Sequence, residues 1–134
     1  MTLIERASHP DASAIRTLIV DDCEVVRTSL VKFVKTIPAI ELVGVAATGI
    51  EAIELAGEKK PQLVLMDFQM PGLNGLEAAL LLRDLDPTIR VILISAEDLS
   101  FVEDCWGAGG ADAFVHKANL IYELKPTINR LFTR

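Results

Sequence analysis

Five short apolar runs alternate with segments of helical periodicity along this chain of 134 residues. The runs are residues 16–20, 40–47, 63–66, 91–94 and 113–116. Each run is short and largely apolar, as is typical of strands that are covered by helices on both faces of a sheet. Strands that alternate with helices through short connections predict an α/β fold, in which a parallel sheet lies between two helical layers.

Helices are expected in the gaps between these runs, over residues 24–37, 48–58, 74–85, 98–106 and 119–132. Thr48 with Glu51, and Asn74 with Glu77, have the spacing of a capping box, in which two residues at the start of a helix bond reciprocally. Pro126 lies inside the last segment and should loosen or bend its first turns, because proline removes a backbone donor. The pattern therefore predicts five strand-and-helix units.

The connectivity of these units limits the order of the strands. Right-handed crossovers leave few topologies for a chain of this length. We expect a flavodoxin-like (βα)5 three-layer sandwich with a parallel sheet in the order 2-1-3-4-5. Residues 1–14 are a polar segment that we expect to be a flexible N-terminal arm, and residues 15–134 are predicted to form one compact domain.

The composition argues against several functional classes. The formal net charge of -6 opposes binding of this segment to nucleic acid or to anionic lipid. No apolar stretch reaches the roughly 18 residues of a membrane span, and residues 1–14 lack the apolar core of a secretory signal. Cys23 and Cys105 are too far apart for a CxxC motif and are expected to be free thiols. We therefore expect a cytoplasmic protein.

Polar side chains follow or end four of the apolar runs. Asp21 and Asp22 follow the first run, Asp67 the third, Ser95 the fourth and Lys117 the fifth. Because the carboxyl ends of parallel strands emerge at one edge of a sheet, we expect these residues to converge there. Clustered carboxylates repel one another unless a cation lies between them, and their hard oxygen atoms suit Mg²⁺ (or Mn²⁺) rather than zinc or copper. The sequence therefore predicts a site that handles phosphoryl groups.

Four stretches carry a family resemblance: LIVDD at 18–22, LVLMDFQMPGLNG at 63–75, VILISA at 91–96 and GGADAFVHK at 109–117. Together, over about residues 16–132, they resemble the receiver domain of bacterial two-component response regulators. The resemblance implies a signal-transduction switch in which Asp67 accepts a phosphoryl group from a histidine kinase or a phosphotransfer protein.

The resemblance also implies roles for the residues around the phosphoacceptor. Asp21, Asp22, Asp67 and the backbone carbonyl of Gln69 would bind the metal. The phosphoryl-binding and switch residues would be Ser95, Ala96, Lys117 and Phe114, and Gln69 and Glu97 would tune dephosphorylation. The altered face would consist of 98–106, 113–116 and 119–132, where Trp106 and Tyr122 are expected, and it would control a downstream partner, self-dimerisation or an output domain.

Several of these residues also have a purely structural interpretation. Asp22 could cap the first helix, and Ser95 could form a capping pair with Asp98. Asp67 could form an Asx-turn, and Phe114 could be an ordinary core residue. At Asp67 function is favoured, because an acid beside a buried apolar run needs compensation. A lone Lys117 would usually be solvated, and for Lys117 and Phe114 only the joint pattern favours function.

Two other functional classes remain open. A hydrolase of the haloacid dehalogenase type also uses an Asp nucleophile, but it needs an acid where Gln69 stands. An adaptor would keep the fold without phosphorylation, and the complete set of acids, hydroxyl and lysine argues against it. In the leading interpretation the chain is not an enzyme; it is a phosphoacceptor that is capable at most of self-phosphorylation and autodephosphorylation.

The chain departs from the commonest receiver pattern after the lysine. Many receivers have a proline there, in a cis peptide bond, whereas here Ala118 follows Lys117. A cis bond before a residue other than proline costs roughly 2.5 to 4 kcal/mol, so retaining it would store strain. The variant without proline occurs in receivers attached to DNA-binding domains, which raises the expectation that this chain is part of a longer regulator. Ser95 replaces the commoner threonine and keeps the hydroxyl.

Overall fold

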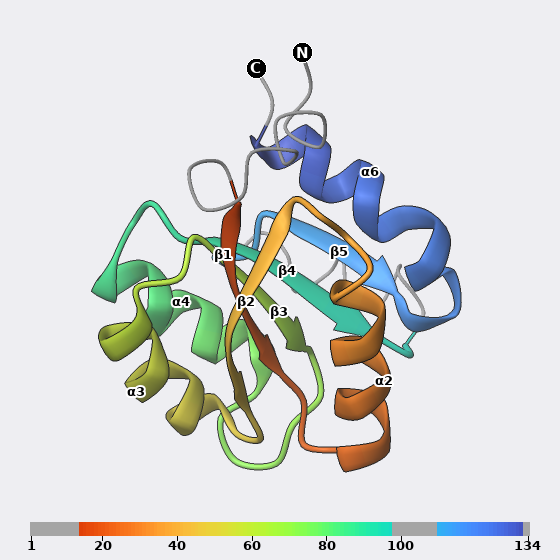
Figure 1. Cartoon of the computed structure of the whole chain (residues 1–134). Coiled ribbons are helices and arrows are strands. Elements are labelled where there is room, and N and C mark those ends of the chain that lie inside the picture. Colours follow the sequence, from red (N-terminus) through yellow and green to blue (C-terminus); the bar gives the residue numbers. More distant parts are fainter. Residues whose placement is uncertain (1–13, 98–109, 133–134) are drawn as a thin grey trace.

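A parallel sheet of five strands forms the centre of the computed structural model, which describes residues 14–97 and 110–132 (Figure 1). The strands are β1 (Ile15–Val20), β2 (Ile40–Ala46), β3 (Leu63–Asp67), β4 (Arg90–Ser95) and β5 (Ala113–His116). They lie in the order β2-β1-β3-β4-β5, and every neighbouring pair is parallel. The predicted strand order and fold class are therefore confirmed.

Helices cover both faces of the sheet (Figure 1). They are α2 (Glu24–Val34), α3 (Gly49–Lys59), α4 (Gly75–Leu85) and α6 (Leu120–Phe132), which follows a short 3-10 helix at Lys117–Asn119. Leu30 of α2 and Leu124 of α6 are buried against one face of the sheet, whereas Ala52 of α3 and Leu82 of α4 are buried against the other. The helix expected over 98–106 lies outside the described residues. In the described part of the chain, no helix has the length and apolar character needed to cross a membrane.

Two helix boundaries differ from the expectation. The first helix ends at Val34 rather than near Ile37, because the Thr36 hydroxyl and the Thr36 backbone N–H both donate to the carbonyl of Phe33 (2.6 and 3.0 Å) and close a turn before the proline. The last helix continues through Pro126. The carbonyl that this proline deprives of a donor belongs to Tyr122, whose side chain is exposed, so water can satisfy that carbonyl.

The two predicted capping boxes differ in outcome. At α4, Asn74 Oδ1 accepts from the Glu77 backbone N–H (2.9 Å) and Glu77 Oε1 accepts from that of Asn74 (3.1 Å), so this box is confirmed. At α3, Thr48 Oγ1 accepts from the N–H of Glu51 (3.1 Å), but Glu51 Oε1 bonds the N–H of Ala47, one residue earlier. The box predicted at α3 is therefore half correct: Thr48 caps the helix, but the Glu51 side chain accepts from Ala47 instead of Thr48.

The start of α4 lies directly against the end of β3, and Gly75 makes this approach possible. A Cβ atom at Gly75 would lie 2.5 Å from the carbonyl oxygen of Asp67 and 2.8 Å from the Cα atom of Phe68. The Gly75 N–H donates to the Phe68 carbonyl at 2.9 Å. Only glycine allows this contact, so the start of α4 fixes the backbone that carries Asp67.

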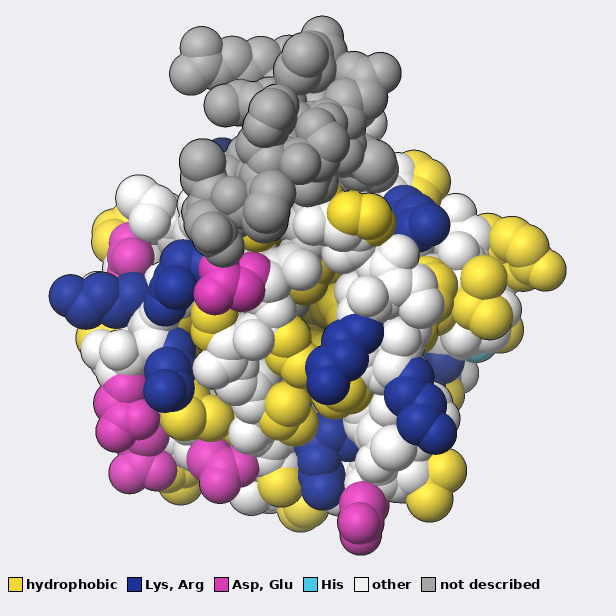
Figure 2. All heavy atoms as spheres, in the orientation of Figure 1, with side chains coloured by type: hydrophobic (Ala, Val, Ile, Leu, Met, Phe, Trp, Pro, Cys, Tyr) yellow, Lys and Arg dark blue, Asp and Glu magenta, His cyan; other side chains and the backbone are white. Residues whose placement is uncertain are grey.

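Basic side chains are dispersed over the face shown in Figure 2. On that face, the described Lys and Arg side chains are interspersed with acidic and apolar ones. This face therefore presents no continuous basic surface among the described residues.

Candidate functional site

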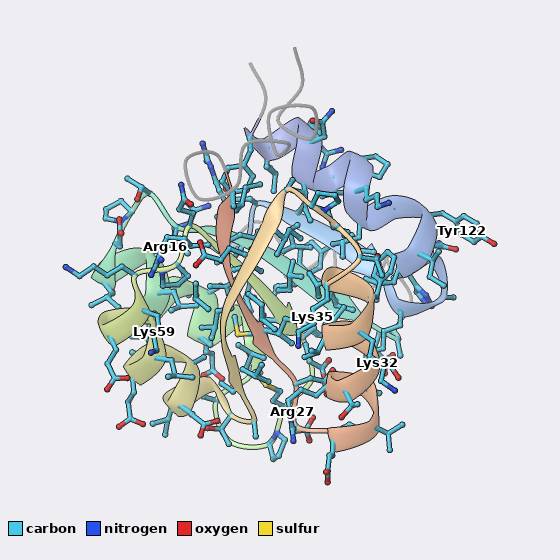
Figure 3. All side chains as sticks on the ribbon, in the orientation of Figure 1. Arg16, Arg27, Lys32, Lys35, Lys59 and Tyr122 are labelled. Carbon is cyan, nitrogen blue, oxygen red and sulfur yellow. The ribbon has the colours of Figure 1, made fainter. Side chains whose placement is uncertain are left out.

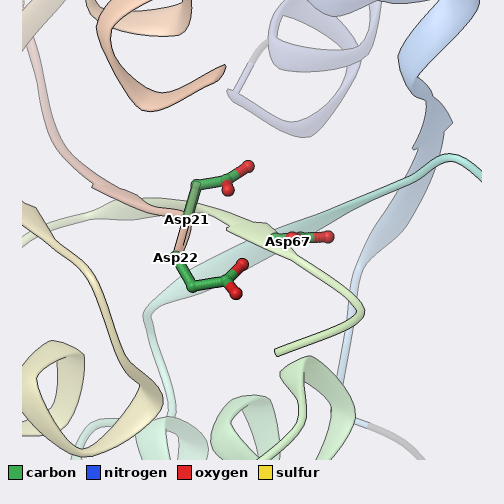
Figure 4. A group of neighbouring side chains, drawn as sticks. All are labelled: Asp21, Asp22 and Asp67. Carbon is green, nitrogen blue, oxygen red and sulfur yellow. The ribbon is translucent and has the colours of Figure 1, made fainter. Parts of the chain in front are cut away.

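Three carboxylates gather at the carboxyl edge of the sheet (Figure 4). Asp21 and Asp22 follow β1, and Asp67 ends β3, the strand beside β1 in the sheet. Each residue offers one oxygen atom, and these atoms all lie within 4.8 Å of one another. Asp21 and Asp67 are only 2% and 6% exposed, whereas Asp22 is exposed. The structure thus brings together the three acids that the sequence placed at one edge.

Asp21 is held at several points. Its backbone N–H donates to the Ala46 carbonyl (3.1 Å), and its Oδ1 atom accepts from the backbone N–H of Cys23 (2.8 Å). Its own carbonyl accepts from Nη1 of Arg27 (2.8 Å). The residue at the N-cap of α2 is Cys23, and it makes no side-chain capping bond, so the alternative that Asp22 caps this helix is wrong. The Asp22 carboxylate forms no hydrogen bond or ion pair with the described residues, which leaves its oxygens available to a ligand.

Asp67 combines a structural bond with an unfavourable electrostatic environment. Its Oδ1 atom accepts from the backbone N–H of Gln69 (3.2 Å), so the Asx-turn weighed as an alternative is present alongside the acidic cluster. Burial and the neighbouring carboxylate of Asp21 raise the pKa of Asp67 from 3.8 to about 6. The Lys117 ammonium and the Gln69 N–H lower this pKa and only partly offset the rise. The negative charges are therefore incompletely compensated by the protein.

Lys117, the residue directly after β5, reaches the cluster with its side chain. Its Nζ atom lies 3.8 Å from Oδ2 of Asp21 and 3.8 Å from Oδ2 of Asp67. The ammonium thus bridges the two buried acids, as expected for a lysine at this edge of the sheet. Its side chain keeps 29% exposure, so an anion can reach it from solvent.

The peptide bond after Lys117 is trans, because no cis bond occurs among residues 14–97 and 110–132. The Lys117–Ala118 bond therefore does not retain the cis form, and the strain that a cis bond would store there is excluded. His116 makes the turn instead: its Nδ1 atom accepts from the Ala118 N–H (3.0 Å) and opens the 3-10 helix. A side-chain acceptor two residues back fixes such a turn without proline. No pattern in the sequence indicated this role for His116.

Four further predicted residues lie at or just after the carboxyl ends of β3 and β4. Ser95 is buried at the end of β4, and its Oγ atom accepts from the backbone N–H of Glu97 (2.9 Å). Glu97 Oε1 also accepts from Nε2 of Gln69 (3.0 Å), so one bond links the loops after β3 and β4. No described residue donates to the Gln69 carbonyl, and Ala96 is exposed. The proposed capping pair of Ser95 with Asp98 falls partly outside the described residues.

Phe114 lies in β5, on the face of the sheet covered by α3 and α4. It is half-buried and meets Phe68 edge to face, with ring centroids 6.3 Å apart and an interplanar angle of 66°. It therefore packs against the residue directly after Asp67. Tyr122 is exposed on α6, and Trp106 lies outside the described residues.

Two charged residues make contacts that the sequence patterns did not predict. Asp112, just before β5, accepts from the Val91 N–H (2.8 Å) and pairs with Arg83 and Arg90, which ties α4 to the amino ends of two strands. Arg27 bonds the backbone of the acidic cluster, as described above. Both side chains reach across loops, and periodicity in the sequence carries no information on such contacts.

The donor set of this edge fits a small divalent cation. Carboxylate oxygens are hard ligands of the kind that Mg²⁺ prefers. Two oxygens bound to one Mg²⁺ at about 2.1 Å lie at most about 4.2 Å apart. The three oxygens lie within 4.8 Å of one another, so small side-chain rotations can bring them around one ion. The unpartnered Asp22 carboxylate and the raised pKa of Asp67 indicate that a cation would relieve repulsion here.

An apolar groove of about 380 Å³ opens next to this edge, between α2 and the start of α6. Val25, Leu30, Phe33 and Ile121 line it, together with Lys117. Because the Lys117 ammonium reaches the buried acids, its side chain connects the groove to the acidic cluster.

Comparisons with known proteins identify relatives of this chain. A family model described as the response regulator receiver domain matches residues 17–129. The chain is 35% identical over 119 residues to the response regulator GacA of Pseudomonas aeruginosa, and the match covers 88% of this chain and 55% of that protein. The chain spans about half the length of the GacA proteins it matches.

Solved structures agree with this relationship. The response regulator domain of Thermotoga maritima CheB is 34% identical with a TM-score of 0.78, over 88% of this chain and 96% of that one. A DNA-binding response regulator of the LuxR family from Staphylococcus aureus is 28% identical with a TM-score of 0.79, over 87% of this chain and 98% of that one.

Proposed function

The chain belongs to the response regulator receiver domain family, and from that membership we propose that it is a phosphorylation switch with Asp67 as its phosphoacceptor. One observation carries the assignment. Asp67 lies at the carboxyl edge of the sheet with two further carboxylates beside it and a lysine ammonium 3.8 Å away. A phosphoryl group that arrives there would meet a nucleophile, a cation site and a fixed positive charge.

The chemistry of transfer needs each of these parts. A carboxylate oxygen of Asp67 forms a new O–P bond, while the P–N bond of a donor phosphohistidine breaks and the imidazole takes up a proton. Mg²⁺ held by Asp21, Asp22, Asp67 and the Gln69 carbonyl would neutralise the phosphoryl oxygens. Lys117 would contact the same oxygens, because phosphoryl transfer depends mainly on positioning and charge stabilisation.

Phosphorylation would then change the surface to which partners bind. Phosphorylation adds roughly two negative charges and strong acceptor atoms. In our proposal the Ser95 hydroxyl leaves the Glu97 N–H and turns to the phosphate, with the Ala96 N–H as a second donor. Phe114 would respond through the same loop and alter the face of β5, α6 and residues 98–106. Gln69 and Glu97, which bond each other across the site, would set the access of water and so the lifetime of the phosphate.

The partners follow from the chemistry and from the relatives. We propose a histidine kinase or phosphotransfer protein as the donor. The apolar groove beside Lys117 supplies a surface on which a protein donor could pack next to Asp67. The partner that binds the phosphorylated form would be a downstream protein, a second copy of this chain or an output domain. A DNA-binding output domain is favoured by the similarity to regulators of the LuxR family.

The test is incubation with acetyl phosphate and Mg²⁺, followed by intact mass measurement. We expect one added phosphoryl group in the wild type and none in Asp67→Asn or without the metal. Labelling that persists in Asp67→Asn would contradict the assignment of the acceptor. No labelling of the wild type would favour an adaptor that keeps the fold without phosphorylation, and many turnovers per protein would favour a hydrolase.

A further inference from the structure

Arg27 contacts the acidic cluster from α2, and the predicted set of site residues does not include it. We propose that Arg27 is a positioning residue: its guanidinium fixes the peptide plane between Asp21 and Asp22 and thereby aims both carboxylates at the cation. The inference rests on the proposed function, because it assumes that the cluster binds Mg²⁺.

The contact follows from the geometry of α2. Side chains on a helix tilt toward its amino end, so an arginine near the start of α2 can reach the loop that precedes the helix. Figure 3 shows Arg27 at the end of α2 that lies next to the carboxyl end of β1. Its Nη1 atom donates to the carbonyl oxygen of Asp21 at 2.8 Å, and its side chain is partly buried.

The bonded carbonyl belongs to the peptide unit that joins the two acids. The carbonyl of Asp21 and the N–H of Asp22 lie in one rigid plane, so a bond that fixes one end fixes the other. Asp21 has further bonds through its own N–H and its Oδ1 atom. The Asp22 carboxylate has none with the described residues, so its direction depends on its backbone and on its own side-chain torsions. Arg27 is therefore the described side chain that acts most directly on the aim of Asp22.

Charge and positioning make opposite predictions for this residue. A guanidinium near a cation site repels the cation, so removing it should strengthen Mg²⁺ binding if only its charge mattered. If Arg27 instead holds the ligands in place, removing it should weaken binding, because residues that orient metal ligands typically contribute 10- to 100-fold in affinity. The sign of the effect decides between the two roles.

The experiment compares Arg27→Met, Arg27→Lys and Lys32→Met with the wild type by calorimetric titration of Mg²⁺. Lys32 is an exposed cation of the same helix, so Lys32→Met is the control for lost charge. We expect the dissociation constant to rise about tenfold or more in Arg27→Met, to rise less in Arg27→Lys, and not to rise in Lys32→Met. Urea unfolding of each variant checks that it is folded.

Two further readouts separate positioning from a general loss of structure. In Arg27→Met the amide resonance of Asp22 should move, because it belongs to the released peptide plane, while resonances of β4 stay in place. With acetyl phosphate, the Mg²⁺ concentration for half-maximal labelling should rise, whereas the rate at saturating Mg²⁺ stays close to that of the wild type.

The outcomes are distinguishable. Arg27→Met that binds Mg²⁺ as tightly as the wild type, or more tightly, overturns the positioning role and leaves the proposed function intact. A wild-type protein that binds no Mg²⁺ overturns both.

Discussion

Replacing Asp67 with asparagine should stabilise the metal-free protein at neutral pH. The pKa of Asp67 is raised from 3.8 to about 6, mainly by burial and by the neighbouring carboxylate of Asp21. Because the folded state holds the proton more tightly than the unfolded state, the protein loses stability as the pH rises through this interval. A rise in pKa from 3.8 to about 6 corresponds to about 3 kcal/mol. Asparagine has the same shape but no charge to bury, so the variant avoids this loss.

The sign and the pH window follow from the same shift. Well below pH 3.8 the carboxyl group is protonated in both states, so wild type and Asp67→Asn should differ little in stability. Between about pH 4 and pH 6 the unfolded chain releases the proton first, and the difference grows in favour of the variant. Above the folded-state pKa the difference should level off near its full value. The titration of groups that do not interact with Asp67 is common to both proteins and cancels in the comparison.

The assay is urea unfolding followed by circular dichroism, at several pH values from about 3 to about 7.5, without divalent cations. Asp84→Asn serves as the control, because Asp84 is exposed on α4 and lies outside the cluster. A free-energy difference that does not change with pH, or an Asp67→Asn variant that is less stable at pH 7.5, would refute the reasoning. Added Mg²⁺ should stabilise the wild type more than the variant, because the cation relieves the same repulsion.

Three further predictions concern the contacts around the cluster. Lys117→Met should raise the pKa of Asp67 further, since the ammonium lowers it, and a carbon-detected NMR titration measures this. Gly75→Ala should destabilise the protein by about 1 to 3 kcal/mol in urea unfolding, because its Cβ would lie 2.5 Å from the Asp67 carbonyl oxygen. Gly57→Ala, where a Cβ meets nothing within 4 Å, should instead be neutral or stabilising by roughly 0.5 to 1 kcal/mol. Asn74→Ala should cost about 1 kcal/mol through the lost capping box, and equal stability with the wild type would contradict this.

The sheet and the convergence of the acids could be predicted because both depend on local patterns. Apolar runs mark the buried strands, and parallel strands place their carboxyl ends at one edge whatever their spacing in the sequence. The capping box of Asn74 and Glu77 is equally local. The end of α2 was missed, although Pro38 is close, because a proline limits how far a helix can extend and does not determine its last residue. In this chain the Thr36 hydroxyl donates to the Phe33 carbonyl, and α2 ends at Val34, before the proline.

Contacts made by long or flexible side chains could not be predicted in this way. The Arg27 guanidinium reaches back to Asp21, and Glu51 bonds Ala47 rather than Thr48, because such side chains have several partners within reach. The turn after β5 shows the same limit. Without proline, the sequence allowed a strained cis bond, but His116 supplies an acceptor that fixes a trans turn.

The electrostatics of the edge link its stability to its proposed use. The fold buries Asp67 beside Asp21, and the lysine 3.8 Å away does not fully compensate their charges. The free energy of unfolding of the metal-free protein is therefore lower near neutral pH than it would be with an uncharged residue at this position. A ligand that brings positive charge offsets the cost of burying this carboxylate beside Asp21, in addition to forming its own bonds to oxygen. Because Asp67 takes up a proton near pH 6, protons compete for the same carboxylate, so cation affinity should fall as the pH is lowered through this value. The buried negative charge of Asp67 beside Asp21 thus lowers the stability of the metal-free protein and also favours the binding of a cation.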